Sequence, residues 1–164
     1  MTLRSIIFIT TLFLVTPTLG QTRTLTGKII DQEFNPVYQA RIYNADTVLL
    51  TMGDRVGNFS LAIPSGTKTL IFRALSMEPK RIELTDSCNN LEIILLSSYT
   101  YDFMTPAKVD RLRKKQFNKL PALHQAAFEK GIFETNKPCY VDRFIAYRKE
   151  MIKRHKAWLR THNT

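Results

Sequence analysis

The chain has 164 residues, of which 44% are hydrophobic and 23% are charged, and its formal net charge is +10 at pH 7. This composition excludes a mainly disordered chain and predicts one modest globular domain with an appendage. The excess of positive charge indicates either a surface for an acidic partner or a solvated helix face.

The first twenty residues have the three parts of an export signal. Arg4 supplies a short positive region, residues 6–15 form an apolar run that two threonines interrupt, and small residues precede Gln21. We expect residues 1–20 to be a signal peptide that is cleaved before Gln21. The alternative is an uncleaved anchor, but the run is shorter than the ~20 residues of a spanning helix. The mature chain is therefore expected in the periplasm, at an outer membrane or outside the cell.

Seven short strands are predicted between residues 21 and 98. In the central segment Phe59, Leu61 and Ile63 alternate with small or polar residues, which sends one apolar row toward a core. The turn at 64–66 and the strand at 69–72 behind it predict a β-hairpin. Strands separated by turn signals, with no long helical period, predict an antiparallel β-sandwich. The predicted strands are 25–31, 37–43, 47–51, 59–63, 69–72, 80–84 and 91–96.

Several blocks of this half resemble the carboxypeptidase regulatory-like domain, a seven-stranded prealbumin-like sandwich of exported Bacteroidetes proteins. The resemblance implies a non-catalytic module for support or interaction, and it supplies no active-site residues. The blocks are Gly27-Lys28-Ile29-Ile30-Asp31, Asn35-Pro36-Val37, Ala40-Arg41-Ile42, Gly57-Asn58-Phe59-Ser60-Leu61, Ile63-Pro64-Ser65-Gly66 and Thr69-Leu70-Ile71-Phe72.

The chain contains two cysteines, Cys88 in the strand-rich half and Cys139 in the half that follows. In an oxidising compartment an even pair favours one disulfide, which would join the two halves across a long loop. The alternative is two separate, buried thiols. A bridge requires the two Cα atoms to lie within ~7 Å of each other. Sequence spacing does not reveal that distance, so both alternatives stay open.

Residues 99–164 are predicted to form a basic helical extension. Residues 21–100 carry eight basic and eight acidic side chains, so nearly all of the net charge lies beyond them. Thr105-Pro106 is typical of a helix start, and Pro121 interrupts the helix that follows. A second helix is predicted over 121–130 with Gly131 as its cap, and a third over 142–160.

The third predicted helix is amphipathic and basic. Its apolar side is a stripe made of Val141, Phe144, Ile145, Met151, Ile152, Trp158 and Leu159. One interpretation is that this stripe packs on the sandwich or on the other helices. A second is a surface that binds a partner or an anion, such as an acidic membrane or envelope glycolipid. The residues of that candidate surface are Arg148, Lys149, Lys153, Arg154, His155, Lys156, Trp158 and Arg160.

Arg148 and His155 fall inside the apolar stripe by helical rotation. They predict either a site for a carboxylate beside a titratable histidine, or two side chains at the rim with their charged ends in water. Tyr99, Tyr101 and Phe103, in the junction of the two halves, are expected to pack between them, and the alternative is a stacking platform for sugar.

No constellation for catalysis or metal binding can be assembled. His124, His155 and His162 lack zinc-binding spacing, and nucleophile, phosphate-loop and dinucleotide motifs are absent from the sequence. We therefore expect no cofactor, no catalytic residues and no nucleic-acid partner. The sequence predicts a non-enzymatic, exported interaction module of a bacterial cell envelope that binds a protein partner. Binding of a glycan or an acidic surface is the alternative, and an enzyme of unrecognised type is the third.

Overall fold

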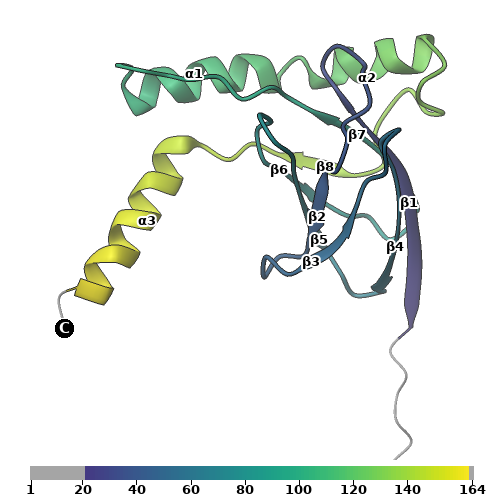
Figure 1. Ribbon diagram of the computed structural model, residues 1–164, viewed down its shortest axis with the longest axis horizontal. Coiled ribbons are helices and arrows are strands. Elements are labelled where there is room, and N and C mark those ends of the chain that lie inside the picture. Colours follow the sequence, from purple (N-terminus) through teal and green to yellow (C-terminus); the bar gives the residue numbers. More distant parts are fainter. Residues whose placement is uncertain (1–20, 163–164) are drawn as a thin grey trace, which may run out of the picture.

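The computed structural model describes residues 21–162, so the predicted signal peptide lies outside the described residues (Figure 1). All seven predicted strands are present, although some bounds differ, and three helices follow them. The strands are β1 (Thr22–Asp31), β2 (Arg41–Tyr43), β3 (Leu49–Met52), β4 (Asn58–Pro64), β5 (Thr69–Arg73), β6 (Lys80–Glu83), β7 (Asn90–Leu95) and β8 (Val141–Arg143). The helices are α1 (Pro106–Phe117), α2 (Leu120–Glu129) and α3 (Tyr147–His162).

The strands form two sheets that pack into a sandwich. The smaller sheet has the order β4-β1-β7, and the larger has the order β3-β2-β5-β6-β8. Neighbouring strands are antiparallel except for β1 and β7, which run parallel. The predicted β-sandwich with a helical extension is therefore confirmed, with one parallel pair inside an otherwise antiparallel arrangement.

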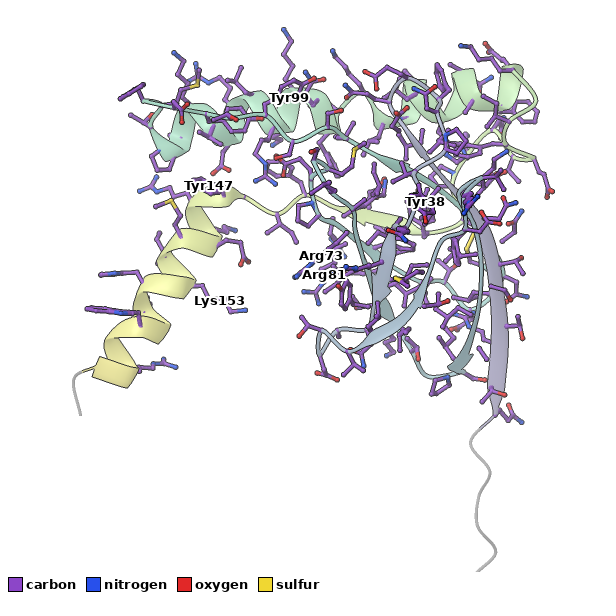
Figure 2. The ribbon with its side chains drawn as sticks, viewed as in Figure 1. Tyr38, Arg73, Arg81, Tyr99, Tyr147 and Lys153 are labelled. Carbon is purple, nitrogen blue, oxygen red and sulfur yellow. A yellow bond between two sulfur atoms is a disulfide. The ribbon has the colours of Figure 1, made fainter. Side chains whose placement is uncertain are left out.

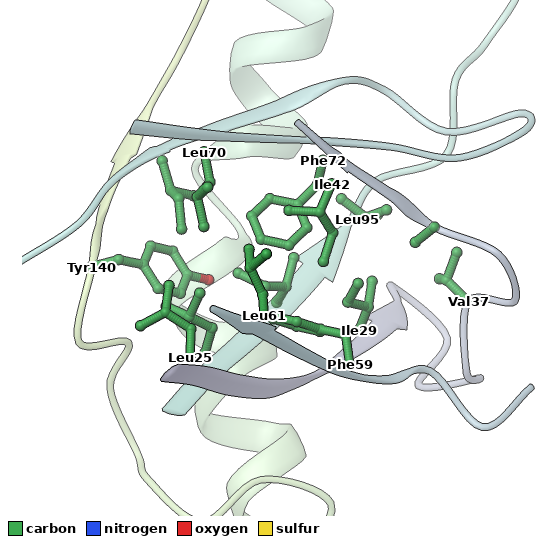
Figure 3. Packing of buried hydrophobic residues seen from close by; sticks show 14 of the residues in the cluster. Leu25, Ile29, Val37, Ile42, Phe59, Leu61, Leu70, Phe72, Leu95 and Tyr140 are labelled. Atoms are coloured by element: carbon green, nitrogen blue, oxygen red, sulfur yellow. The ribbon is translucent and has the colours of Figure 1, made fainter. Parts of the chain in front are cut away.

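The core lies between the sheets and is filled by alternate residues of both. Leu25 and Ile29 of β1 face Ile42 and Leu70 of the larger sheet, and all four are fully buried (Figure 3). Phe59 and Phe72 meet edge to face across the core with ring centroids 5.9 Å apart. Burying each of these side chains contributes on the order of 1.5–3 kcal/mol, so this cluster is the main source of stability.

The predicted hairpin of residues 59–63 and 69–72 is wrong. Those residues lie in β4 and β5, which belong to different sheets, so the turn at 64–66 carries the chain across the core. Alternation places Phe59 and Phe72 on the core side of their strands. However, two strands show the same alternating pattern whether they are hydrogen-bonded neighbours in one sheet or face each other from two sheets. The sequence therefore showed which side chains point inward and not which strand would be the neighbour.

The first two predicted helices are confirmed. Thr105 caps α1 by accepting a hydrogen bond from the backbone nitrogen of Lys108, and Pro106 is the first helical residue. Gly131, with φ of 68°, follows the end of α2. Helix α2 packs Leu120 and Ala127 against Ile94 on the outer side of the smaller sheet. Both faces of β7 are therefore covered, which explains why Leu91, Ile93, Ile94 and Leu95 are all apolar and buried.

The third helix begins later in the chain than predicted. Residues 141–143 form the edge strand β8, which pairs with β6, and α3 begins only at Tyr147. Val141, Phe144 and Ile145 are therefore not on a helix with Met151. An apolar segment this short has no decisive period, and the tertiary pairing with β6 determines its conformation.

Two tethers bring the extension back to the sandwich. Cys88 and Cys139 form a disulfide with Cα atoms 5.4 Å apart, so the two cysteines are bridged and are not separate thiols. The buried carboxylate of Glu92 accepts hydrogen bonds from the backbone nitrogens of Glu134 and Thr135 and from the Thr135 hydroxyl. These contacts hold the segment after α2 against β7 and place β8 beside β6.

Helix α3 extends away from the sandwich (Figure 1). Its apolar side chains Met151 and Ile152 are 44% and 47% exposed, and Trp158 is 54% exposed. The interpretation that this stripe packs on the body of the same chain is therefore wrong for these residues, while the side chain of Leu159 lies outside the described part. Within residues 21–162, no helix combines the length and hydropathy that a membrane span requires.

Candidate binding groove

A groove of about 710 Å³ separates the outer face of the larger sheet from α3. The walls combine charged, aromatic and aliphatic side chains, and the junction before α1 closes one end. Figure 2 shows Arg73 and Arg81 extending from the sheet toward α3, while Lys153 extends from α3 toward the sheet. The lining includes Ile71, Arg73 and Arg81 of the sheet and Tyr147, Met151 and Lys153 of α3.

The outer face of the larger sheet, part of which forms one wall of the groove, is rich in arginine. Ile42, Phe72 and Ile82 point into the core, so their neighbours along each strand point outward. This outer face carries four arginines, and Glu83 is its acidic residue among the described strands. We call the four the arginine face: Arg41 of β2, Arg73 of β5, Arg81 of β6 and Arg143 of β8.

Strand register sets these arginines directly opposite one another. Arg41 pairs with Arg73 between β2 and β5, and Arg81 pairs with Arg143 between β6 and β8. Like charges in directly opposed positions destabilise a sheet. Arg143 is compensated by Glu83, with Nη2 and Oε2 2.7 Å apart, and the guanidinium of Arg73 lies 5.4 Å from the ring centroid of Tyr43. The rest of the positive charge faces solvent.

The start of α3 is fixed to α1. The carboxylate of Asp110 accepts hydrogen bonds from the backbone nitrogens of Tyr147 and Arg148, at 2.5 and 3.2 Å. An acid at this position satisfies N–H groups that the first turn of a helix leaves without partners. On the same helix, Arg113 binds Glu78 at 2.8 Å and the backbone oxygen of Ile145 at 3.0 Å. These bonds orient α3 relative to the sheet and keep the groove open.

Behind the sheet wall lies a buried ion pair. Lys80 Nζ is 2.8 Å from an oxygen of Asp142 and 5.3 Å from the ring centroid of Tyr140. Burial lowers the pKa of Lys80, and the neighbouring Asp142 carboxylate partly offsets this change. Burial also raises the pKa of Tyr140 well above its ordinary value, and its hydroxyl donates to the backbone oxygen of Glu92. These groups join β6 and β8 and serve the fold.

The candidate residues predicted on α3 are exposed wherever the structure describes their side chains, but they do not converge on one point. Of them, Lys153 lines the groove, and the side chain of Arg154 lies outside the described part. His155 stacks on Trp158 with ring centroids 6.4 Å apart. Arg148 and His155 are both exposed, which agrees with the rim interpretation. The other exposed members are Lys149, Lys156 and Arg160.

The aromatic residues of the junction divide between two environments. Tyr99 and Tyr101 line the groove and an adjoining apolar crevice of about 50 Å³ between the sandwich and α1. Phe103 is fully exposed, so the prediction that it packs between the two halves is wrong. Its positive φ of 59° places it in a turn that directs the ring away from the body.

Sequence reasoning missed the arginine face entirely. The strand-rich half has equal numbers of acidic and basic residues, and this zero net charge does not reveal that three of its arginines share one side of one sheet. Alternation in 71–73 and 81–83 indicates which residues point outward, but the cross-strand register that groups them cannot be read from one strand. In the described part of the chain, no cluster of three or more His, Cys, Asp or Glu residues could hold a metal ion.

Comparison with known proteins bears on the fold. A family model described as "CarboxypepD_reg-like domain" matches residues 25–103. Among solved structures, the chain resembles one titled "Crystal structure of the C-terminal domain of the PapC usher" with 14% identity and a TM-score of 0.33. That match covers 47% of this chain and 100% of the other. The comparison with curated proteins found no match.

Proposed function

Residues 25–103 form a carboxypeptidase regulatory-like domain, and from this premise we propose that the chain is a non-catalytic interaction module of a bacterial cell envelope. Domains of this kind are regulatory rather than catalytic, so the function is sought in binding surfaces. The surface proposed here is the groove together with the exposed side of α3, and its occupant is a protein.

The exposed apolar side of α3 is the observation that carries this proposal. Met151, Ile152 and Trp158 are each about half exposed on a helix that leaves the body of the molecule. Amphipathic helices normally bury their apolar side, and recognition of such a helix by a groove or helix of another protein is a common binding mode. Aromatic residues, methionine and arginine are also the side chains enriched in protein interfaces.

Two features support export to an oxidising compartment. The first twenty residues have the pattern of a cleaved signal, and Cys88 and Cys139 are joined in a disulfide. Structural disulfides persist outside the cytosol, where thiols are not kept reduced. We therefore propose that the mature chain functions in the periplasm, at the outer membrane or outside the cell.

Site-specific photo-cross-linking in producing cells tests the proposed function. A photoreactive amino acid replaces Met151 on α3, and the matched control replaces Ser60, an exposed residue of β4 in the other sheet. We expect a discrete protein adduct from position 151 and none from position 60. Failure to trap any protein at position 151, or trapping of lipid or glycan instead, would contradict the proposal.

A further inference from the structure

We propose that the groove binds an acidic segment of the partner protein. Its carboxylates contact Arg73 and Arg81, the two members of the arginine face that line the groove, while its apolar side chains contact α3. This inference rests on the proposed function and adds the chemistry of the partner to it. It is carried by the position of the arginines on the sheet, the identity of these cations, and the shape and lining of the groove.

The first observation is that the fold keeps an arrangement that disfavours its own stability. Arg41 opposes Arg73, and Arg81 opposes Arg143, on the same face of adjacent strands. A carboxylate at position 73 or 81 would replace repulsion with attraction, because each of these positions lies directly opposite another arginine. On the described part of that face, Glu83 supplies the acidic charge against four arginines. An acidic occupant would supply the compensation that the sheet itself lacks.

The second observation is that all four cations of this face are arginine. A guanidinium presents a planar set of N–H donors that fits a carboxylate with two parallel hydrogen bonds, whereas a lysine ammonium acts as a point charge. On α3 the composition is different, because that helix carries both lysines and arginines. The sheet wall is therefore suited to oriented contacts with carboxylates, and α3 to general attraction of negative charge.

The third observation is the distribution of the remaining charges in the groove. Glu78 is bound by Arg113, which leaves Asp102 in the junction and Glu150 in the first turn of α3 as its other acidic lining residues. Both belong to segments beside α1, while Arg73 and Arg81 belong to the sheet wall. The acidic side chains of the occupant are therefore expected to face the sheet.

The shape of the site favours a protein segment over a membrane surface. Arg73, Arg81 and Ile71 lie on one wall of a concave groove whose other wall is α3. A flat bilayer reaches the rim of such a groove, whereas an extended chain can enter it. Tyr147 and Met151, which are both exposed, give that chain apolar contacts on the α3 wall.

Fluorescence anisotropy with a defined probe tests this inference on the mature full-length chain. The probe is a labelled peptide of alternating glutamate and leucine, and its control has glutamine in place of glutamate. The test variant is Arg73→Glu/Arg81→Glu. The matched control variant is Arg55→Glu/Lys68→Glu, which makes the same change in net charge at exposed turns outside the groove.

We expect the acidic peptide to bind the unmodified chain and the control variant, and to bind the arginine variant about tenfold or more weakly. Raising the salt from about 0.1 M to about 1 M should also weaken binding, because the screening length falls from ~10 Å to ~3 Å. The arginine variant should melt at a higher temperature than the unmodified chain, since each new glutamate opposes an arginine. Lost binding therefore could not be ascribed to unfolding.

Three results would overturn the inference: equal binding of the acidic and glutamine peptides, equal weakening by the two variants, or binding of anionic phosphatidylglycerol vesicles without binding of the peptide. The cross-linking experiment remains separate. A protein adduct at position 151 that persists in the arginine variant would support the proposed function and contradict the inference that the partner binds through an acidic segment. Absence of any adduct would reject the proposed function itself.

Discussion

Two glycines permit the closest backbone contacts of the smaller sheet. A Cβ atom at Gly27 would overlap the carbonyl oxygen of Leu91 on β7 and approach the ring of Phe59. Gly57 has φ of 79°, and a Cβ atom there would overlap the carbonyl oxygen of Ile29. Both neighbours are backbone atoms, which cannot rotate away as a side chain can. These positions explain why glycine opens two of the blocks that resemble the family.

Gly27→Ala is expected to destabilise the chain by about 1–3 kcal/mol, because the added methyl group forces β1 and β7 apart. Chemical denaturation measures this change. The control is Gly66→Ala, where no atom lies within 4 Å of the added Cβ and the effect should be close to zero. Equal stability of the two variants would show that β1 and β7 do not approach each other as described.

His124 is a second residue whose environment predicts a measurable property. It is 3% exposed, its Nε2 atom lies 3.5 Å from Glu92 Oε2, and its ring packs against Phe133. Burial lowers the pKa of His124, while the neighbouring Glu92 raises it and Lys80 lowers it further. The net direction is downward, so the folded chain binds a proton at His124 less readily than the unfolded chain.

Stability should therefore decrease as the pH falls below about 6.5, where His124 begins to bind a proton in the unfolded chain. Urea denaturation at about pH 7.5 and pH 5.5 measures the effect, which His124→Leu should reduce. His155→Gln on the exposed helix α3 is the control and should retain the full dependence. If His124→Leu retained it as well, another group would be responsible.

At the scale of the elements, alternation and turn residues predicted where the strands lie and which side chains enter the core. They did not predict pairing, as β4 and β5 show, because facing strands and paired strands have the same alternation. They also missed β8, whose three residues are held by contacts with β6 and by the bridge from Cys139 to Cys88. Those contacts join residues that are far apart in the sequence, and a local sequence pattern cannot indicate such contacts.

The disulfide should be the main covalent support of β8. Cys88 and Cys139 are 51 residues apart, and closing a loop of this length is expected to stabilise the fold by about 2–4 kcal/mol. Cys88→Ala/Cys139→Ala should lower the free energy of unfolding by that amount in guanidinium denaturation. Reduction of the unmodified chain with dithiothreitol should have the same effect on it and none on the variant. An unchanged midpoint after verified reduction would contradict this role.

At the scale of the whole molecule, the charge count predicted a basic extension, and the structure adds a basic sheet face beside it. The sequence predicted a candidate surface on α3 and missed the sheet face opposite it for a physical reason: the position of a helix relative to a sheet depends on a few contacts, here those of Asp110 and Arg113 of α1. The proposed binding activity depends on this arrangement, in which α3 stands apart from the sheet and its apolar side remains accessible.

Iodide quenching of tryptophan fluorescence in the isolated mature chain tests that arrangement most directly, because Trp158 on α3 is the single tryptophan of the sequence. With 54% of its surface exposed beside the ring of His155, it should emit at a wavelength typical of a tryptophan in contact with water, and iodide should quench that emission. A blue-shifted emission that iodide does not quench, in a chain shown to be monomeric, would mean that α3 packs on its own body. The proposed binding surface would then not exist.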